Sequence, residues 1–454
     1  MKNKDTDYQI STKELVKVTA SGWLGTAMEF MDFQLYSLAA AIVFNQIFFP
    51  EASPAMGLIM AMGTYGAGYV ARLVGAYIFG RMGDRIGRKN VLVVTIMMMG
   101  IATALIGVLP TYQQVGILAP ILLIVLRIIQ GLGAGAEISG AGVMVAEFAK
   151  PSKRGLVGSF VCLGTSSGTL LANLVWTIIL TVQTEQQLLA WGWRIPFFLS
   201  LLTMITAIII RMHIKESPVM EEKKKLLMEE RENAVQHSGA NLSKNKANVA
   251  KTKNGKRNFL IALGLRFGQA GNSGLLQTYM AGYIVTILAL EKTVATNANI
   301  ISSLVSFITI PIVGYIGDKI GRKKMYMILS LAMAIFAIPM MMMIDSGNPA
   351  IITIALILGL NIGVQGMFAL ENVVLAELFG SKNRMTLMAL AKEIAGCIAT
   401  GFGPVIAAAL VAAFTNSWIP LAAMVIFFSL SAFISAFASA DTTGRDLNEL
   451  EDAA

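Results

Sequence analysis

The chain has 454 residues, of which 55% are hydrophobic and only 14% are charged, whereas soluble domains carry about 25% charged residues. The net charge of +9 does not indicate nucleic acid binding, because the Lys and Arg residues lie in short segments between long apolar runs, a pattern that orients a membrane protein. Composition therefore excludes an ordinary soluble domain and predicts an all-α polytopic membrane protein.

The N-terminus, MKNKDTD, is polar and shows no short apolar segment with a cleavage site, so we expect no signal peptide. A membrane-spanning helix needs about 20 predominantly apolar residues. Twelve runs of that kind follow, at residues 18–44, 57–80, 90–110, 117–147, 156–182, 195–213, 259–289, 298–317, 325–344, 350–376, 385–414 and 418–438.

The basic residues predict the orientation of these twelve spans. Alternate connecting segments hold nearly all of the Lys and Arg, whereas the opposite loops hold only Arg194 and Lys292. Basic residues accumulate on the cytoplasmic side, so both termini are expected to be cytoplasmic. We therefore expect a cytoplasmic tail at 1–17, a six-helix bundle at 18–213, a cytoplasmic linker at 214–258, a second six-helix bundle at 259–438 and a cytoplasmic tail at 439–454.

A decapeptide after the second span is repeated after the eighth. Residues 80–89 read GRMGDRIGRK and residues 314–323 read GYIGDKIGRK, with seven of ten positions identical. The repeat predicts two similar halves. It also predicts a cytoplasmic gate formed by Gly80, Asp84, Arg85, Gly87, Arg88, Asp318, Arg322 and Arg384.

Asp84 is expected near the start of the eleventh span, around residues 384–387, because a helix N-terminus carries roughly half a positive charge. Pseudo-symmetry places Asp318 at the start of the fifth span. Arg85 and the other basic residues of the repeat would bridge neighbouring helices and lipid phosphates. The alternative is that the decapeptides only fix the topology.

The polar segment 214–258 is best explained as a linker, with a basic lipid-facing patch as the alternative. The chain contains no GxxxxGK[ST] loop for ATP. Its two cysteines and two histidines show no metal-ligand spacing, so we expect neither a metal nor a cofactor.

Charged residues inside the spans are costly and require partners or water. The acids are Glu29, Asp32, Glu137, Glu371 and Glu393, and the bases are Arg72, Arg127, Arg266 and Lys392. Helical spacing predicts polar stripes on spans four, seven and ten. Such stripes on otherwise apolar helices are expected to meet at an aqueous cavity.

Besides the decapeptides, three stretches are distinctive: residues 20–50, RIIQGLG at 127–133 and WGWRIPF at 191–197. Together these motifs resemble those of the metabolite:proton symporters of the major facilitator superfamily. Members carry organic acids such as α-ketoglutarate, citrate or shikimate, or zwitterions such as proline and betaine. The resemblance implies that spans 1, 4, 7 and 10 line a central cavity. Leu73 stands where the family usually has proline after the arginine of span two, and Ala136 where it usually has glycine, so the substrate does not carry over.

In the family fold, Arg127 and Arg266 would face each other across the two halves. A carboxylate would then bind by paired hydrogen bonds to arginine. The expected substrate-binding residues are Arg127, Arg266, Gln269, Gln277, Asn361, Gln365 and Arg72. Two structural alternatives stay open: Arg127 pairs with Glu29 or Glu137, and Arg72 extends toward the inner membrane surface.

Glu29 and Asp32 lie one turn apart on the first span, at positions where the family carries Glu and Asp. Two carboxylates so close in a low dielectric are not expected to stay ionised together. We expect Asp32 to carry the proton, with Glu29 as its partner and Glu137 as the next candidate. The alternative is that Glu29 or Asp32 only neutralises Arg127 or Arg72.

The sequence thus predicts a secondary active transporter for proton-coupled symport of a small organic metabolite, with a carboxylate as the first expectation and a zwitterionic osmolyte as the second. A non-transporting membrane sensor is the alternative from another class. The chain shows no nucleophile–base set typical of an enzyme. We expect a monomer in a bacterial cytoplasmic membrane, with protons and a small molecule as its partners and no nucleic acid.

Overall fold

The computed structural model describes residues 11–51, 54–213, 216, 221, 255–290, 292–415 and 417–453, and within these ranges the chain contains helices and no β-strand. Most of the predicted linker at 214–258 and residues 1–10 of the predicted N-terminal tail lie outside the described residues. The other predicted elements can be compared directly with the structure.

The first half contains six spans. They are α1 (Thr12–Ala39) with η1 (Ala40–Phe44) and α2 (Asn45–Phe48), α3 (Pro54–Ile86), α4 (Arg88–Gly107), α6 (Leu118–Ala134) with α7 (Glu137–Phe148), α8 (Arg154–Val182) and α10 (Ile195–Met212). Short elements connect them: α5 (Tyr112–Val115), η2 (Pro151–Lys153), α9 (Glu185–Ala190) and η3 (Gly192–Arg194).

The second half repeats the pattern. Its spans are α12 (Gly255–Ser273) with η4 (Gly274–Tyr279) and α13 (Met280–Thr286), α14 (Lys292–Ile320), α15 (Arg322–Asp345), α16 (Pro349–Leu360) with η5 (Asn361–Gly366) and α17 (Met367–Leu378), α18 (Arg384–Gly396) with η6 (Cys397–Gly401) and α19 (Phe402–Ala413), and α20 (Ile419–Ala438).

The expected twelve spans are confirmed, with helices that extend beyond the apolar runs. In the described part of the chain, nine helical segments are long and apolar enough to cross a membrane. The other three, the first, second and seventh spans, carry more polar residues. Several helices also start earlier than expected: α1 begins at Thr12 rather than 18, and Ser11 caps it by accepting a hydrogen bond from the Lys13 amide.

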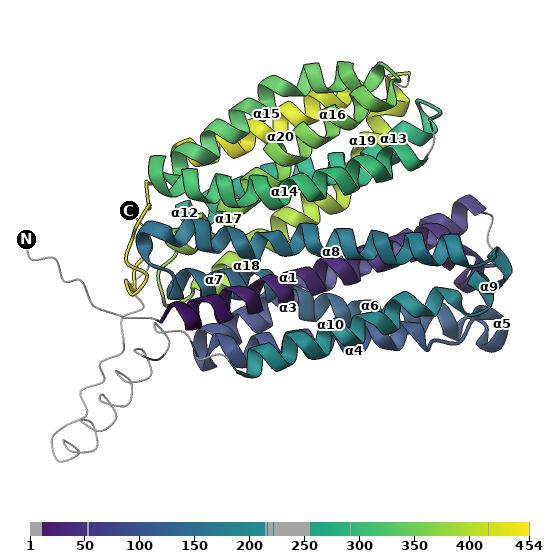
Figure 1. Ribbon diagram of the computed structural model, residues 1–454, viewed down its shortest axis with the longest axis horizontal. Coiled ribbons are helices and arrows are strands. Elements are labelled where there is room, and N and C mark those ends of the chain that lie inside the picture. Colours follow the sequence, from purple (N-terminus) through teal and green to yellow (C-terminus); the bar gives the residue numbers. More distant parts are fainter. Residues whose placement is uncertain are drawn as a thin grey trace, which may run out of the picture.

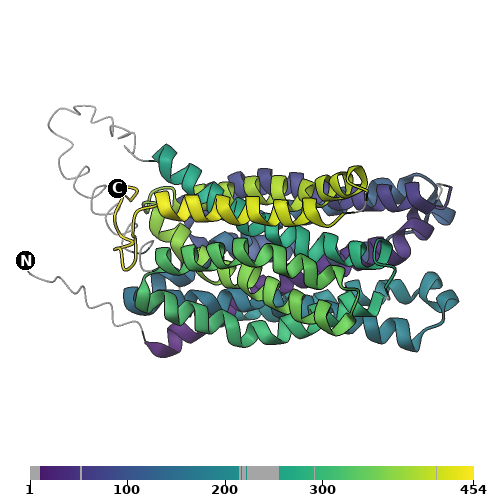
Figure 2. The same ribbon diagram turned by 90° about the horizontal axis from the view of Figure 1, so that it is seen from above.

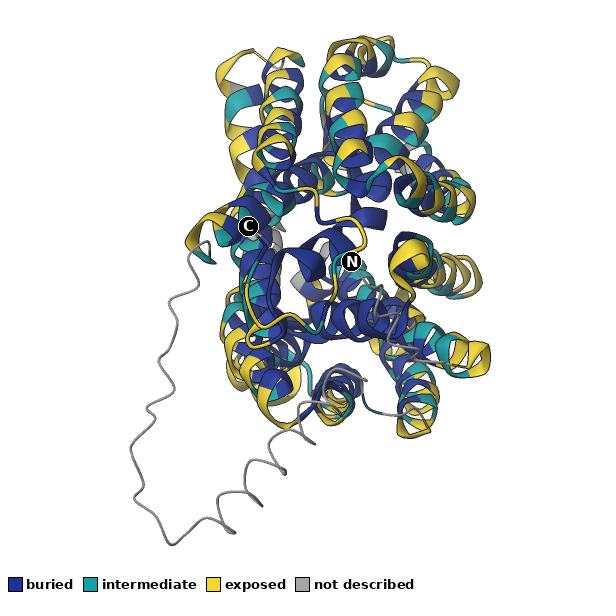
Figure 3. Ribbon diagram, turned by 90° about the vertical axis from the view of Figure 1, so that its left-hand side faces the viewer, coloured by how far each residue is buried: buried dark blue, intermediate teal, exposed yellow. Residues whose placement is uncertain are grey.

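The two halves form two bundles that lie side by side along the long axis (Figures 1 and 2). They contact each other mainly where α8 meets α14 and where α3 meets α18. Figure 3 shows buried residues facing the interior and exposed residues facing outward. Many of the exposed residues are large and apolar, such as Ile308, Ile335 and Phe437, as expected for a surface that lipid covers.

Both decapeptides lie at one end of the molecule, on the left in Figure 1, and we call this the repeat end. The segment 439–453 also packs there. The Ser381 amide donates to the Glu449 carbonyl at 2.9 Å, the Ala453 amide donates to the Leu378 carbonyl at 3.0 Å, and Leu447 is only 3% exposed. The segment expected as a C-terminal tail is therefore anchored to the second half.

Helical irregularities fall on all four spans expected to line the cavity and also on the eleventh span. One-turn π-helices interrupt the first, seventh, tenth and eleventh spans at η1, η4, η5 and η6. The fourth span is broken between α6 and α7, at Gly135 and Ala136. Such π turns are frequent at functional sites because they redirect side chains.

Candidate functional site

Asp84 docks on the first turn of α18. Its carboxylate accepts hydrogen bonds from the Met385 amide at 3.1 Å, the Thr386 amide at 2.8 Å and the Thr386 hydroxyl at 2.7 Å. A Cβ at Gly80 would lie 2.8 Å from the Thr386 Cα, so the backbones of α3 and α18 approach closely here. The expected placement of Asp84 at a positive helix N-terminus is confirmed.

Asp318 makes the equivalent contact with the first half. Its two carboxylate oxygens accept hydrogen bonds from the Gly155 and Leu156 amides, each at 2.8 Å, in the first turn of α8. The placement expected from pseudo-symmetry is confirmed. Each half therefore presents an aspartate to the start of a helix in the other half.

A buried glutamate completes each of these clusters. Glu147 forms an ion pair with Arg88, with an N···O distance of 2.8 Å, and accepts a hydrogen bond from Arg384 at 2.9 Å. We name Asp84, Arg88, Glu147 and Arg384 the first repeat cluster. Its arginines come from different halves, so Glu147 holds the halves together.

The second repeat cluster consists of Asp318, Arg322, Glu377 and Arg154. Glu377 accepts from Arg322 at 2.7 Å and from Arg154 at 2.6 Å. Sequence reasoning assigned no site role to Arg154. A signal was present, because residues 147–154 and 377–384 share a glutamate followed seven residues later by an arginine.

Two other expected members of this site have different surroundings. Gly87 has φ 118° at the junction of α3 and α4, a left-handed conformation that favours glycine. Arg85 is exposed on the last turn of α3. The structure therefore does not bring Arg85 into the first repeat cluster.

In the middle of the molecule, Arg72 joins the two halves. Its Nη2 donates to Glu29 at 2.7 Å, and its Nε donates to Glu393 at 2.7 Å. Arg72 is only 6% exposed. The alternative that Arg72 extends toward the membrane surface is wrong, because the two carboxylates hold it inside.

Asp32 belongs to a different network, although it lies one turn from Glu29. Its Oδ2 accepts from the Thr103 hydroxyl at 2.8 Å, and Gln130 donates to the same hydroxyl at 2.7 Å. Arg127 in turn donates to Gln130, and its guanidinium lies 4.0 Å from the ring centroid of Tyr36. Within the described residues Asp32 forms no ion pair, and its Oδ1 is buried without a hydrogen-bond partner.

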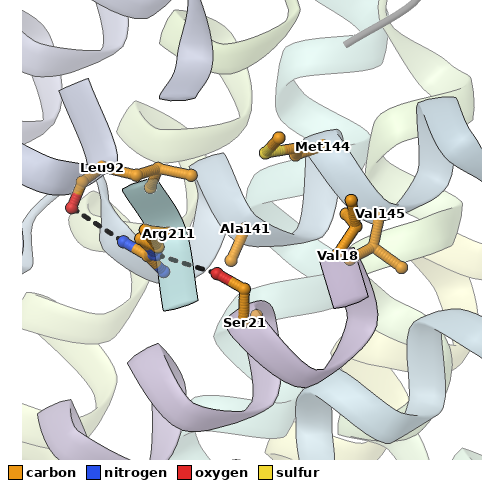
Figure 4. Close-up of a pocket in the computed structure, with 8 residues that line it drawn as sticks. Val18, Ser21, Leu92, Ala141, Met144, Val145 and Arg211 are labelled. Atoms are coloured by element: carbon orange, nitrogen blue, oxygen red, sulfur yellow. Dashed lines mark hydrogen bonds between the residues drawn. The ribbon is translucent and has the colours of Figure 1, made fainter. Parts of the chain in front are cut away.

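Glu137 pairs with an arginine that sequence reasoning missed. Arg211 donates to Glu137 at 2.5 and 3.0 Å, and the Thr95 hydroxyl adds a bond of 2.8 Å. Arg211 also bonds the Leu92 carbonyl and the Ser21 hydroxyl (Figure 4). The alternative that Arg127 pairs with Glu29 or Glu137 is wrong, since these acids pair with Arg72 and Arg211.

Arg211 lies one residue before the end of α10, inside the expected sixth span at 195–213, but it was not counted among the charges within the spans. A Cβ at Gly25 would lie 2.3 Å from its Nη2, so only a glycine leaves room for the guanidinium. With Arg211 included, the charges within the twelve expected spans, outside the two repeat clusters, balance as five acids against five bases.

The second half supplies a third group of charges. Arg266 donates to Gln269 at 2.5 Å and to Glu371 at 3.5 Å, while Lys392 lies 3.4 Å from Glu371 and donates to Asn372 at 2.6 Å. The Arg266 side chain is 14% exposed, and its Nε has no hydrogen-bond partner within the described residues. One carboxylate thus serves two cations, and Arg266 keeps donor capacity.

The remaining expected binding residues are dispersed. Asn361 donates to the Ser302 hydroxyl of α14 at 3.0 Å. Gln365 accepts from Thr165 of the first half at 3.2 Å, and Gln277 accepts from Ser273 at 2.7 Å. The structure therefore brings Arg266 together with Gln269 and places Arg72 and Arg127 against the same Phe33 ring. It directs Asn361 toward α14 instead.

Comparisons with known proteins match this architecture. A family model described as "Sugar (and other) transporter" matches residues 59–454. The putative transporter YdfJ of Escherichia coli (strain K12) is 53% identical over 93% of this chain and 96% of its own length. The shikimate transporter of the same organism is 32% identical over 90% of this chain and 91% of its own length.

A solved structure shares the fold. The major facilitator superfamily proton:xylose symporter XylE bound to 6-bromo-6-deoxy-D-glucose matches with a TM-score of 0.75 at 17% identity, over 97% of this chain and 99% of that chain.

Proposed function

The chain belongs to the sugar (and other) transporter family of the major facilitator superfamily, as its sequence motifs indicated, and we propose that it carries a small organic carboxylate in symport with protons. It is a multi-pass membrane transporter of a small molecule rather than an enzyme. We propose the identity of the coupling ion, the class of substrate and the roles of individual residues.

The environment of Asp32 supports proton coupling most directly. Glu29 forms an ion pair with Arg72, which it shares with Glu393, whereas Asp32 forms no ion pair among the described residues. Each of the two acids leaves one buried oxygen without a hydrogen-bond partner. A buried ionised carboxylate without a counter-charge is costly, and protonation removes that cost. We therefore propose that Asp32 carries the transported proton.

The chain of contacts from Asp32 links the proton to the substrate. Deprotonated Asp32 is held by Thr103, which is hydrogen-bonded to Gln130, the partner of Arg127. Protonation of Asp32 removes the negative charge near Arg127 and frees the guanidinium for a substrate carboxylate. The two ligands then favour the same conformation, which is the thermodynamic requirement for coupling.

Charge balance favours an anion as the co-transported species. The intramembrane acids and bases are equal in number, so a bound carboxylate adds one uncompensated negative charge. One proton on Asp32 restores neutrality before the occluded state forms. Arg266, with an unpartnered Nε and partial exposure, offers a second guanidinium to the same carboxylate.

The two repeat clusters serve as the gate in this proposal. In the present conformation their ion pairs close the repeat end, and they must break for that end to open. We propose that this end is cytoplasmic, with both termini and the 214–258 linker inside a bacterial cytoplasmic membrane, and that the transporter functions as a monomer. A single cysteine at Ser53 should react with an impermeant reagent in whole cells, and one at Ser238 should not. The reverse pattern contradicts this orientation.

One observation favours a zwitterion as the second candidate. Arg266 and Glu371 lie 3.5 Å apart, so a molecule with both a carboxylate and an ammonium group would meet both charges. The two candidates differ electrically: one proton with a monoanion moves no net charge, whereas one proton with a zwitterion moves one positive charge.

Uptake by proteoliposomes tests the proposal. A thermal-shift screen of carboxylates and betaines first identifies a ligand, and its uptake is then measured with an imposed proton gradient. Asp32→Asn is expected to lose accumulation but keep exchange at equal concentrations, because the neutral amide mimics the protonated form. If Asp32→Asn and Glu29→Gln both accumulate substrate normally, the proton pathway lies elsewhere. Uptake that responds to membrane potential identifies the zwitterion.

A further inference from the structure

An apolar groove of about 460 Å³ opens on the outer surface between α1, α8 and α14. Its lining on α1 extends from Leu15 to Trp23, and Phe160 on α8 and Phe307 on α14 complete it. We propose that this groove binds one acyl chain of a phospholipid that carries an anionic head group.

The dimensions of the groove match one chain in one leaflet. From Leu15 to Trp23 the groove follows α1 for about 12 Å, at about 1.5 Å per residue. One leaflet contributes half of the roughly 30 Å hydrocarbon core. The volume also lies within the range of about 300–1,000 Å³ that is usual for small-molecule pockets.

The lining explains why the groove is open and what fills it. Ala20 and Thr19 are small residues on the face of α1 that lines it, whereas Trp23 and Phe160 are large and partly exposed. The Trp23 indole donates to the Ser167 hydroxyl at 3.0 Å, which satisfies its polar atom and fixes the ring in the lining. With almost no polar group in the lining, the groove favours a hydrocarbon chain over water.

Basic residues lie next to the Leu15 side of the groove lining. Lys13 lies on α1 two residues before Leu15, and Lys153 lies one turn before Val157, which lines the groove on α8. Both lysines are exposed. A basic residue near a membrane surface attracts an anionic head group by about 1 kcal/mol, so these positions select the charge of the lipid.

The groove also lies on the seam between the halves. Its walls on α1 and α8 belong to the first half, whereas Phe307 belongs to the second. Beside it, Ser306 donates to Ser166 across the seam at 2.6 Å. A lipid acyl chain bound in the groove contacts both halves and stabilises the arrangement in which the repeat end is closed.

Quenching of Trp23 fluorescence by brominated lipids tests this site. The protein is reconstituted with dibrominated phosphatidylglycerol or phosphatidylcholine, and the Trp23 signal is taken as the difference between the wild type and Trp23→Phe. We expect phosphatidylglycerol to quench Trp23 at a several-fold lower mole fraction. Ala20→Phe fills the groove and should abolish this preference, and it should lower the number of phosphatidylglycerol molecules retained in native mass spectrometry.

Two further variants distinguish the contribution of the lipid head group to binding from that of the acyl chain. Leu202→Phe, on an exposed face of α10, is the matched control and should leave quenching and retention unchanged. The Lys13→Gln, Lys153→Gln double variant should lose the preference for phosphatidylglycerol while quenching by phosphatidylcholine persists. Three results would overturn the proposal. The first is equal quenching by both lipids in the wild type, and the second is unchanged quenching and retention in Ala20→Phe. The third is protection of Trp23 as the protein-to-lipid ratio rises, which would indicate that a second copy of the protein occupies the groove.

Discussion

The repeat end and the centre of the molecule hold their charges in opposite ways. At the repeat end the same arrangement is built twice: an aspartate on a helix N-terminus, and a glutamate between two arginines from different halves. In the centre, the described residues share one local feature between the halves, an arginine that donates to a glutamine three residues later, but their ion pairs do not repeat. The first half supplies both Glu29 and Asp32, and the second half supplies Lys392 and Arg266.

This difference follows from what each region has to do. Closing two similar bundles against each other requires matching contacts on both sides of the seam, so duplication is useful there. Binding one substrate and one proton requires a single set of unlike groups. Among the described residues of this central set, only Arg72 forms an ion pair that joins the two halves. The two regions should therefore respond differently to substitution.

The largest effect is expected in the centre, from Arg72→Ala. The change leaves Glu29 and Glu393 buried without their cation, and removal of one partner of a buried ion pair costs about 3–5 kcal/mol. The melting temperature in detergent should fall markedly. Arg81→Ala, at an exposed arginine of the same helix, should leave it nearly unchanged. Equal melting temperatures for the two variants would show that the central pair adds no stability.

The next effect tests the symmetry of the repeat end. Glu147→Gln and Glu377→Gln each weaken two contacts with arginine, one of which crosses the seam: Arg384 to Glu147 and Arg154 to Glu377. A charged hydrogen bond of this kind is worth about 1.5–3 kcal/mol. Spin-label distances between the halves should shift toward an open repeat end by a similar amount in both. Glu185→Gln, at an exposed site away from the clusters, is the control. A shift in one variant without the other would break the equivalence of the clusters.

A smaller effect is expected from Asp84→Asn and Asp318→Asn. Each removes a negative charge from a helix N-terminus, an interaction worth about 0.3–2 kcal/mol. Transport turnover should fall several-fold with little change in substrate affinity, because the substrate does not touch these residues. Asp345→Asn, an exposed substitution at the end of α15, should leave turnover as it is. A loss of affinity instead would place these aspartates in the binding site.

The smallest effect concerns the C-terminal segment. Arg445 donates to the Glu377 carbonyl at 2.9 Å, and its own carbonyl accepts from Arg154 at 2.9 Å. Arg445→Ala removes the bond to the Glu377 carbonyl and the other side-chain bonds of Arg445, to the Leu378 carbonyl, the Glu449 carboxylate and the Glu451 carbonyl, but leaves the bond from Arg154 to the Arg445 carbonyl. A typical hydrogen bond is worth about 0.5–1.5 kcal/mol, and none of the lost bonds crosses between the halves. The spin-label shift should be smaller than that of Glu377→Gln. Arg257→Ala, which removes a bond to the Ala438 carbonyl, is the control, and an effect as large as that of Glu377→Gln would make the segment a principal part of the gate.

The sequence did not predict which way side chains face after a helix departs from regular α-helical geometry. An unbroken helix would place Glu137 on the same stripe as Arg127 and Gln130. The break at Gly135 and Ala136 instead presents Glu137 to Arg211. In the same way, the π turn at η5 begins at Asn361, whose side chain meets α14 rather than the Arg266 group.

The sequence alone determined the twelve spans, the two-half organisation and the placement of Asp84 and Asp318, because these depend on local runs of apolar residues and on a short repeated motif. Only the tertiary structure decided the partners of the buried charges: Arg72 with Glu393, Arg154 with Glu377, and Arg211 with Glu137. The physical reason is that an ion pair depends on the distance and direction of two side chains far apart in the chain. A single turn that departs from α-helical geometry changes both.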